Sequence, residues 1–250
     1  MMEEKIYDYL LQLGDNSMIL GHRLSELCGH GPSLETDIAL TNISLDLFGQ
    51  VRHYFQYAAK LKTDKTEDDI AFLRLANEYR NVLLVEQPNT DFGYVICRQF
   101  LFDAFHLPLL TELVKSADST IKAIANKSIK ESRYHRIFSS EWMKRLGDGT
   151  EESHRRIEQA LDHLYPFAHE LTHMTLVEKE ALHLGIGADL DKIKSDFDGL
   201  VKSTLDETGL NLPESKDRFA KGKEGFHSEY LGPILSEFQS TQRAYPNMEW

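Results

Sequence analysis

Seven acidic and histidine residues have the types and the chain order of ligands in a carboxylate-bridged di-metal centre. In such a centre one helix supplies a carboxylate and the next supplies Glu-x-x-His, and a second pair of helices repeats the pattern. The i, i+3 spacing stacks two ligands on one face of a helix, toward the axis of a bundle. The candidate ligands, in chain order, are Asp46, Asp103, His106, Glu131, His135, Glu170 and His173.

The acid-x-x-His spacing by itself is a weak signal. With 40 acidic residues and 11 histidines among 250 residues, chance alone gives roughly two such pairs. The chain has five of them, so some are accidents of an acidic helical surface. The five pairs are Asp103/His106, Glu151/His154, Glu170/His173, Glu180/His183 and Glu224/His227.

The neighbours of some candidates suit a buried site. Asp46 belongs to a polar stripe that continues through Gln50 and His53 along an otherwise apolar helical segment. Asp103 and His106 lie in a stretch in which most neighbours are apolar. The apolar neighbours predict that Asp103 and His106 are buried in the bundle.

A buried salt-bridge network is the structural alternative to a metal centre, and the sequence favours it. Two of the four carboxylate positions hold Asp, which is one methylene too short to bridge two metals easily. Lys127 precedes Glu131 by four residues, the spacing of an ion pair, and a cation there competes with a metal. Ser132 occupies the place of the acid in a Glu-x-x-His that would end at His135. In this alternative the carboxylates pair with Arg98, Arg133 or Lys127.

The elements that must position these residues are helices. Glycine is absent between Gly49 and Gly93 and again between Gly93 and Gly147, and no alternating strand pattern is present. Apolar residues recur at helical spacing, and Ser33 or Thr36 can cap the second helix. The sequence predicts an all-α, antiparallel bundle in a single domain, residues 1–250. The expected helices span about 4–28, 34–61, 67–85, 93–116, 119–146, 151–184, 189–206 and 227–244.

The segment from Glu207 to Gly225 is the one long irregular stretch that we expect. Its end, Lys221–His227, is basic and contains glycine, and it precedes the last expected helix. Such a segment can hold a phosphate on helix-terminal amide groups, but a flexible connection is the interpretation that the sequence favours.

Composition excludes several classes of partner. The net charge of −12 disfavours binding to nucleic acid or to an anionic membrane surface. Two cysteines are too few for a disulfide framework, the acidic N-terminal segment does not resemble a signal peptide, and no apolar run is long enough to span a membrane. We therefore expect a cytoplasmic protein with no membrane and no nucleic-acid partner.

Six segments spread along the chain resemble the C subunits of phenylacetyl-CoA epoxidase, the PaaC family. Because the matches extend almost from end to end, they are far more specific than any acid-x-x-His pair. The segments are LQLGDN (11–16), ALTNISLDLFGQVR (39–52), LLVEQPN (83–89), KESRYH (130–135), WMKRLGDGT (142–150) and FHSEYLGP (226–233).

The resemblance implies a ferritin-like four-helix bundle with additional helices and a non-catalytic, structural role in a multicomponent oxygenase. It implies that a homologous A-type subunit carries the di-iron centre that epoxidises phenylacetyl-CoA, and that a separate reductase delivers electrons from NADPH. No cofactor and no catalytic residue are then expected on this chain. Besides binding the A-type subunit, the chain can also associate with copies of itself in this interpretation.

The segment from Glu170 to His173 is a complete Glu-x-x-His motif, which a subunit that has lost its metal site does not require. Partial metal binding by this chain is therefore a remaining alternative. The alternative function is an autonomous di-iron carboxylate oxygenase, or a ferritin-like metalloprotein, that uses the same seven residues as ligands. Metal content discriminates between the two functions.

Overall fold

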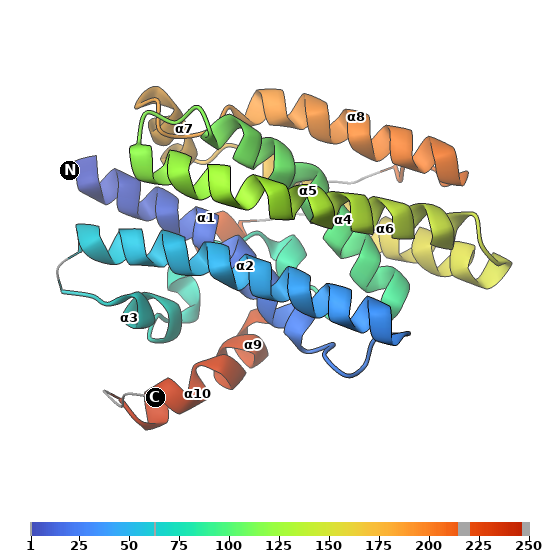
Figure 1. The fold of residues 1–250 in the computed structure, drawn as a ribbon, viewed down its shortest axis with the longest axis horizontal. Coiled ribbons are helices and arrows are strands. Elements are labelled where there is room, and N and C mark those ends of the chain that lie inside the picture. The colour runs from blue at the N-terminus through green and yellow to red at the C-terminus, as the bar shows by residue number, and fades with distance from the viewer. Residues whose placement is uncertain (1, 63, 215–220, 247–250) are drawn as a thin grey trace.

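The computed structural model describes residues 2–62, 64–214 and 221–246, and their regular structure is helical (Figure 1). One isolated bridge, between Lys221 and Phe226, is the sole β-type pairing within these ranges. The α-helices are α1 (Met2–Ser25), α2 (Leu34–Leu61), α3 (Glu67–Phe72), α4 (Phe92–Leu113), α5 (Ser119–Gly147), α6 (Glu151–Thr172), α7 (Leu176–His183), α8 (Leu190–Thr208), α9 (Leu231–Phe238) and α10 (Ser240–Ala244). Short 3-10 helices are η1 (Ala76–Glu78), η2 (Leu83–Glu86) and η3 (Gly222–Glu224).

Four long helices form the centre of the bundle. Helix α1 packs along α2, and α4 packs along α5. Helix α2 also contacts α5, and Figure 1 shows these two helices side by side across the face of the molecule. Helices α6 and α8 cover α4 from its remaining sides. The predicted all-α bundle with additional helices is confirmed.

Helix α4 is the core of the bundle because most of its side chains are apolar and nearly all of them are buried. Asp91 caps its first turn by accepting a hydrogen bond from the amide of Tyr94 (2.8 Å). From Gly93 to Leu110, every residue except Pro108 is buried. A helix that is buried on all faces must be surrounded by other elements, which is the position that α4 has.

Helix α5 has one buried face and one exposed face. Asp118 caps it by accepting from two backbone amides, those of Thr120 and Ile121. Its buried residues recur every three or four positions, and several of them are small and polar, which brings hydroxyl groups and a histidine to the inner face. They are Ile121, Ile124, Ala125, Ser128, Ser132, His135, Ser139, Met143 and Gly147.

The prediction of one helix over 67–85 is wrong. Helix α3 ends at Phe72, and the backbone at Tyr79 and Val82 is extended. The amides of Arg80, Val82 and Leu83 donate to side chains elsewhere in the bundle, at 2.7 to 2.8 Å. Because tertiary partners satisfy these donors, the segment does not need helical hydrogen bonds.

Two other expected helices are interrupted. The helix predicted over 151–184 is divided between Thr172 and Leu176, because Thr175 and Glu178 form a capping box that begins α7. The helix predicted over 227–244 begins only at Leu231 and is divided at Gln239. The predicted cap of α2 is confirmed at Ser33.

The part of the chain that the structure describes contains no helix long and apolar enough to cross a membrane.

Candidate functional site

Five of the seven candidate ligands gather between α2, α4 and α5, as their helical register requires. The two from α6 do not join them. Among the described residues, no group of three histidine, cysteine or acidic side chains is arranged to hold a metal ion. The five gathered residues are Asp46, Asp103, His106, Glu131 and His135.

Asp46 and His135 are joined directly across the two helices. Asp46 Oδ2 on α2 lies 3.0 Å from His135 Nε2 on α5. The histidine side chain is fully buried, whereas a third of the Asp46 side chain reaches solvent. The contact occupies one potential metal ligand on each helix, and it fixes α2 against α5.

Asp103 is a buried carboxyl group that is satisfied by neutral donors. Its Oδ1 accepts from Gln99 Nε2 and its Oδ2 accepts from Ser139 Oγ, both at 2.8 Å. Burial raises the pKa of Asp103 to about 7, although nearby His135 and the two hydrogen bonds lower it. Asp103 is therefore far less acidic than an exposed aspartate.

His106 has the same kind of environment. It is buried, and its Nδ1 lies 3.5 Å from Ser132 Oγ. Desolvation lowers the pKa of His106 to about 3, and repulsion from His135 adds to the shift. His106 is therefore a neutral imidazole that packs beside Phe102.

Glu131 lies at the solvent edge of this group. Partial burial raises its pKa, and the neighbouring charge of Asp46 adds to that effect, while His135 and Lys127 lower it. Glu131 is thus close enough to Asp46 for the two carboxylates to repel each other when both are charged.

Glu170 and His173 lie elsewhere. Glu170 is buried and accepts backbone hydrogen bonds from Leu83 (2.8 Å) and Lys223 (3.2 Å), which ties η2 and η3 to α6. Burial raises the pKa of Glu170, and these hydrogen bonds oppose the rise. His173 is the exposed residue that ends α6. The complete Glu-x-x-His motif thus spans the end of a helix, with its acid used to anchor two loops.

The predicted salt-bridge network is wrong in its partners. Lys127 does not pair with Glu131; its Nζ lies 2.7 Å from His53 Nε2 on α2. Arg98 is fully buried but donates to Gln87 O and to Asn89 Oδ1 rather than to a carboxylate of the site. Arg133 is exposed on α5. Neutral hydroxyl and amide groups occupy the interior in place of the expected cations.

Sequence reasoning missed the polar residues that fill this interior. They are Gln99, Ser132 and Ser139, whereas Gln50, which is also buried, belongs to the polar stripe that the sequence showed along α2. Within the described part of the chain, both side-chain amide atoms of Gln50, Gln99 Oε1 and His135 Nδ1 are buried without a hydrogen-bond partner. The spacing of the α5 serines on the face of His135 is a signal that could have identified two of them.

The donor set does not fit a di-metal centre. Asp46 is bound to His135, Asp103 is enclosed by two neutral donors, and Glu170 is directed into the loops. The orphaned polar atoms are mainly amide and imidazole groups, not the carboxylates that bridge two irons. The arrangement can hold α2, α4 and α5 in fixed positions, and its polar groups are engaged with one another rather than directed toward a substrate.

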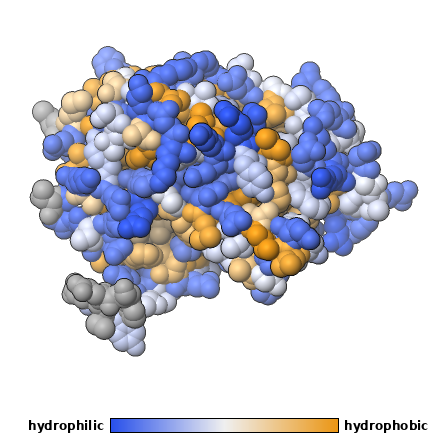
Figure 2. Space-filling view, in the orientation of Figure 1, coloured by the Kyte–Doolittle hydropathy of each residue, from blue (hydrophilic) through white to orange (hydrophobic). Residues whose placement is uncertain are grey.

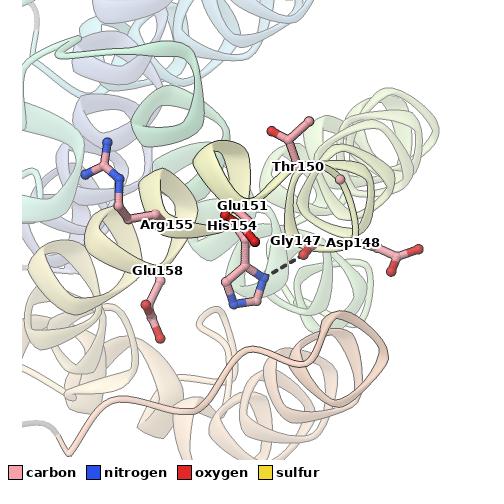
Figure 3. Close-up of a pocket in the computed structure, with 8 residues that line it drawn as sticks. Gly147, Asp148, Thr150, Glu151, His154, Arg155 and Glu158 are labelled. Atoms are coloured by element: carbon pink, nitrogen blue, oxygen red, sulfur yellow. Dashed lines mark hydrogen bonds between the residues drawn. The ribbon is translucent and has the colours of Figure 1, made fainter.

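The pair Glu151/His154 lines a surface hollow of about 360 Å³ at the turn between α5 and α6 (Figure 3). His154 Nδ1 lies 2.6 Å from Gly147 O, so the ring closes the turn that Gly147 begins. Figure 3 shows the side chains of Asp148 and Glu158 directed away from one another. This hollow is a feature of the helix connection and does not assemble its acidic residues into a catalytic group.

The segment Lys221–His227, expected to be a flexible connection, is fixed to the bundle. Lys223 is buried, and its Nζ lies 2.7 Å from Glu178 Oε1 and donates to two backbone carbonyl groups at the end of α6. Glycine is required at position 222 because a Cβ there would collide with the carbonyl oxygen of Asn81. His227 does not pair with Glu224; its Nδ1 lies 2.6 Å from the buried Glu86. The phosphate-binding alternative has no support in these contacts.

Comparison with known proteins places this bundle in a family. The family model described as "Phenylacetic acid catabolic protein" matches residues 1–250. The C subunit of the 1,2-phenylacetyl-CoA epoxidase of Escherichia coli (strain K12) is 43% identical over 242 residues, which cover 97% of this chain and 98% of that protein. The ferritin-like character expected from the sequence is confirmed with the family. The chain belongs to the phenylacetic acid catabolic protein family.

Proposed function

We propose that this chain is the non-catalytic, structural subunit of a multicomponent phenylacetyl-CoA 1,2-epoxidase. The observation that carries the proposal is the interior between α2, α4 and α5, where the candidate ligands are bound to one another and to neutral side chains. The similarity to the C subunit of the Escherichia coli enzyme supports the same function. The 250 residues act as one cytoplasmic domain in this proposal.

The catalytic partner is a homologous A-type subunit that carries the di-iron centre. That centre activates oxygen for epoxidation of the aromatic ring, and a separate reductase supplies electrons from NADPH. The contribution of this chain is a rigid helical surface against which the partner folds. The contact of Asp46 with His135 joins α2 to α5, and the hydrogen bond from Ser139 to Asp103 joins α5 to α4, so together they fix three helices without a metal.

Co-expression with the A-type subunit encoded in the same genome tests the proposal. We expect a stoichiometric complex that survives gel filtration. With reductase and NADPH present, epoxidation of phenylacetyl-CoA should require both large chains. A fully active A-type subunit that never co-elutes with this chain would remove the structural role. Epoxidation by this chain and the reductase alone would favour the autonomous di-iron oxygenase instead.

A further inference from the structure

The outer face of α2 lacks charge over three turns. Between Ile38 and Gly49 its exposed residues are apolar or neutral, and Leu45 is 61% exposed. The one acidic residue in this stretch, Asp46, turns toward His135 on α5. In a chain with 27% charged residues, an uncharged exposed helix face of this length is unexpected for a surface in contact with water.

Helix α5 continues this apolar surface beside α2. Tyr134 and Ile137 are 50% and 54% exposed. Between the first turns of α2 and the second half of α5 lies a groove of about 370 Å³, into which Phe138 and Trp142 also open. Figure 2 shows apolar surface interrupting the hydrophilic surface on the face across which α2 and α5 run in Figure 1. We call this surface, with Ile38, Leu45, Tyr134, Ile137, Phe138 and Trp142, the α2/α5 face.

The two-helix strip that contains the α2/α5 face has the size of a stable protein interface. Helices α2 and α5 have 28 and 29 residues, which makes each about 40 Å long. Two helices side by side present a strip roughly 20 Å wide, or about 800 Å², the area that one partner buries in a stable complex. Within this strip the uncharged stretch of α2 covers residues 38–49, about 18 Å, so the apolar patch is about 360 Å² and charged residues such as Arg52 and Arg133 surround it. An apolar centre with a polar rim is the usual arrangement of a protein interface, and apolar patches of this size on a monomer are often functional.

Charge decides between two classes of occupant. A second copy of this chain would bring another net charge of −12 to the same interface, which opposes self-association. The groove itself is flanked by single charges of both signs, Glu35 and Glu141 against Arg145. Its centre favours an apolar helix from a different chain.

We propose that the α2/α5 face is the surface on which an apolar helical face of the epoxidase's catalytic subunit docks. This inference rests on the proposed function, since that function supplies the partner. Asp46 and His135 then have a positioning role: their contact holds α2 and α5 at the spacing that keeps the groove open. The polar pair at the former ligand positions thereby shapes the docking surface from beneath.

Charge substitutions on the α2/α5 face test the inference. Leu45→Arg and Ile137→Arg each place a cation in the contact, and Leu75→Arg is the matched control, because Leu75 is 59% exposed at the start of η1 and belongs to neither α2 nor α5. All three changes add the same charge at exposed positions. Circular dichroism should be unchanged, and melting temperatures should stay within about 2 °C of wild type. Binding to the purified A-type subunit is measured by titration calorimetry at one ionic strength.

We expect at least a tenfold loss of affinity for Leu45→Arg and for Ile137→Arg, and wild-type affinity for Leu75→Arg. If the wild-type chain and both face variants all bind the A-type subunit with the same affinity, the docking surface is overturned while the proposed function stays intact. Equal weakening by all three variants would overturn it too, since the effect would then be one of charge alone. Failure of the wild-type chain to bind would instead remove the proposed function. A wild-type dimer that Leu45→Arg converts to a monomer would assign the face to self-association.

Discussion

Asp46 Oδ2 lies 3.0 Å from His135 Nε2, so two residues with the types of metal ligands bind each other across α2 and α5. The other ligand types in the same interior are enclosed by Gln99, Ser132 and Ser139. The bundle therefore has the residue order of a di-metal protein and an interior of hydrogen bonds between its own side chains. Its stability should depend on those contacts rather than on a bound metal.

The Asp46→Ala variant should unfold more easily than the wild type. Loss of the carboxylate leaves His135 buried without this hydrogen-bond partner, and a buried polar group without a partner costs about 1–3 kcal/mol. Urea unfolding at pH 7 measures the difference. Asp162→Ala, at an exposed position on α6, is the control and should change stability by less than about 0.5 kcal/mol. Equal stability of the two variants would show that the contact contributes nothing.

Asp103 should give the folded chain a distinctive pH dependence. Its pKa is about 7 in the folded state and about 3.9 in an unfolded chain, so between these values the folded state binds more protons. Asp103 therefore contributes its full stabilisation of the folded state below about pH 4, and this contribution is lost as the pH rises through 7. Asp103→Asn removes the titration.

As the pH rises from 4 to 7, the wild type should therefore lose stability relative to Asp103→Asn by up to about 1.4 kcal/mol for each pH unit. Above pH 7 the difference between the two proteins should stay constant. Urea unfolding at pH 5, 6, 7 and 8 measures this loss, and the difference between the two proteins isolates Asp103 from His106 and His135. A stability difference that is constant with pH would contradict the raised pKa of this buried carboxyl group.

Glu170 should stabilise the segments that contain η2 and η3 rather than bind a metal. Glu170→Ala leaves the backbone amides of Leu83 and Lys223 buried without their acceptor, so hydrogen exchange at both amides should accelerate at least tenfold. Glu170→Gln keeps one acceptor oxygen and should give an intermediate rate. Glu158→Gln, on the exposed face of α6, serves as the control. Unchanged exchange in Glu170→Ala would mean that other contacts fix η2 and η3.

The long helices could be predicted from the sequence because their signals are local. The cap at Ser33, the apolar run of α4 and the glycine-free stretches all act within a few residues. The segment 67–85 could not, because its structure depends on distant residues. Asp15 binds Arg74 and the amide of Arg80, and these partners are 59 and 65 positions away in the chain.

In the candidate site, too, local patterns could be predicted from the sequence and long-range contacts could not. Helical register is enough to bring Asp46, Asp103 and His135 to one interior, since each lies on the inner face of a long helix. The place of Glu170 depends on where α6 meets η2 and η3, and no local pattern contains that information. The missing cations have a similar cause: Lys127 reaches across to His53 rather than along its own helix.

Iron content shows whether the interior between α2, α4 and α5 holds a metal centre. The chain should be purified alone from iron-supplemented cells and analysed by inductively coupled plasma mass spectrometry, with Glu170→Ala prepared in parallel. We expect well under one iron per chain in both proteins, because the possible ligands between α2, α4 and α5 are already engaged in contacts with one another and with neighbouring side chains. About two tightly bound irons per wild-type chain, lost in Glu170→Ala, would contradict this expectation.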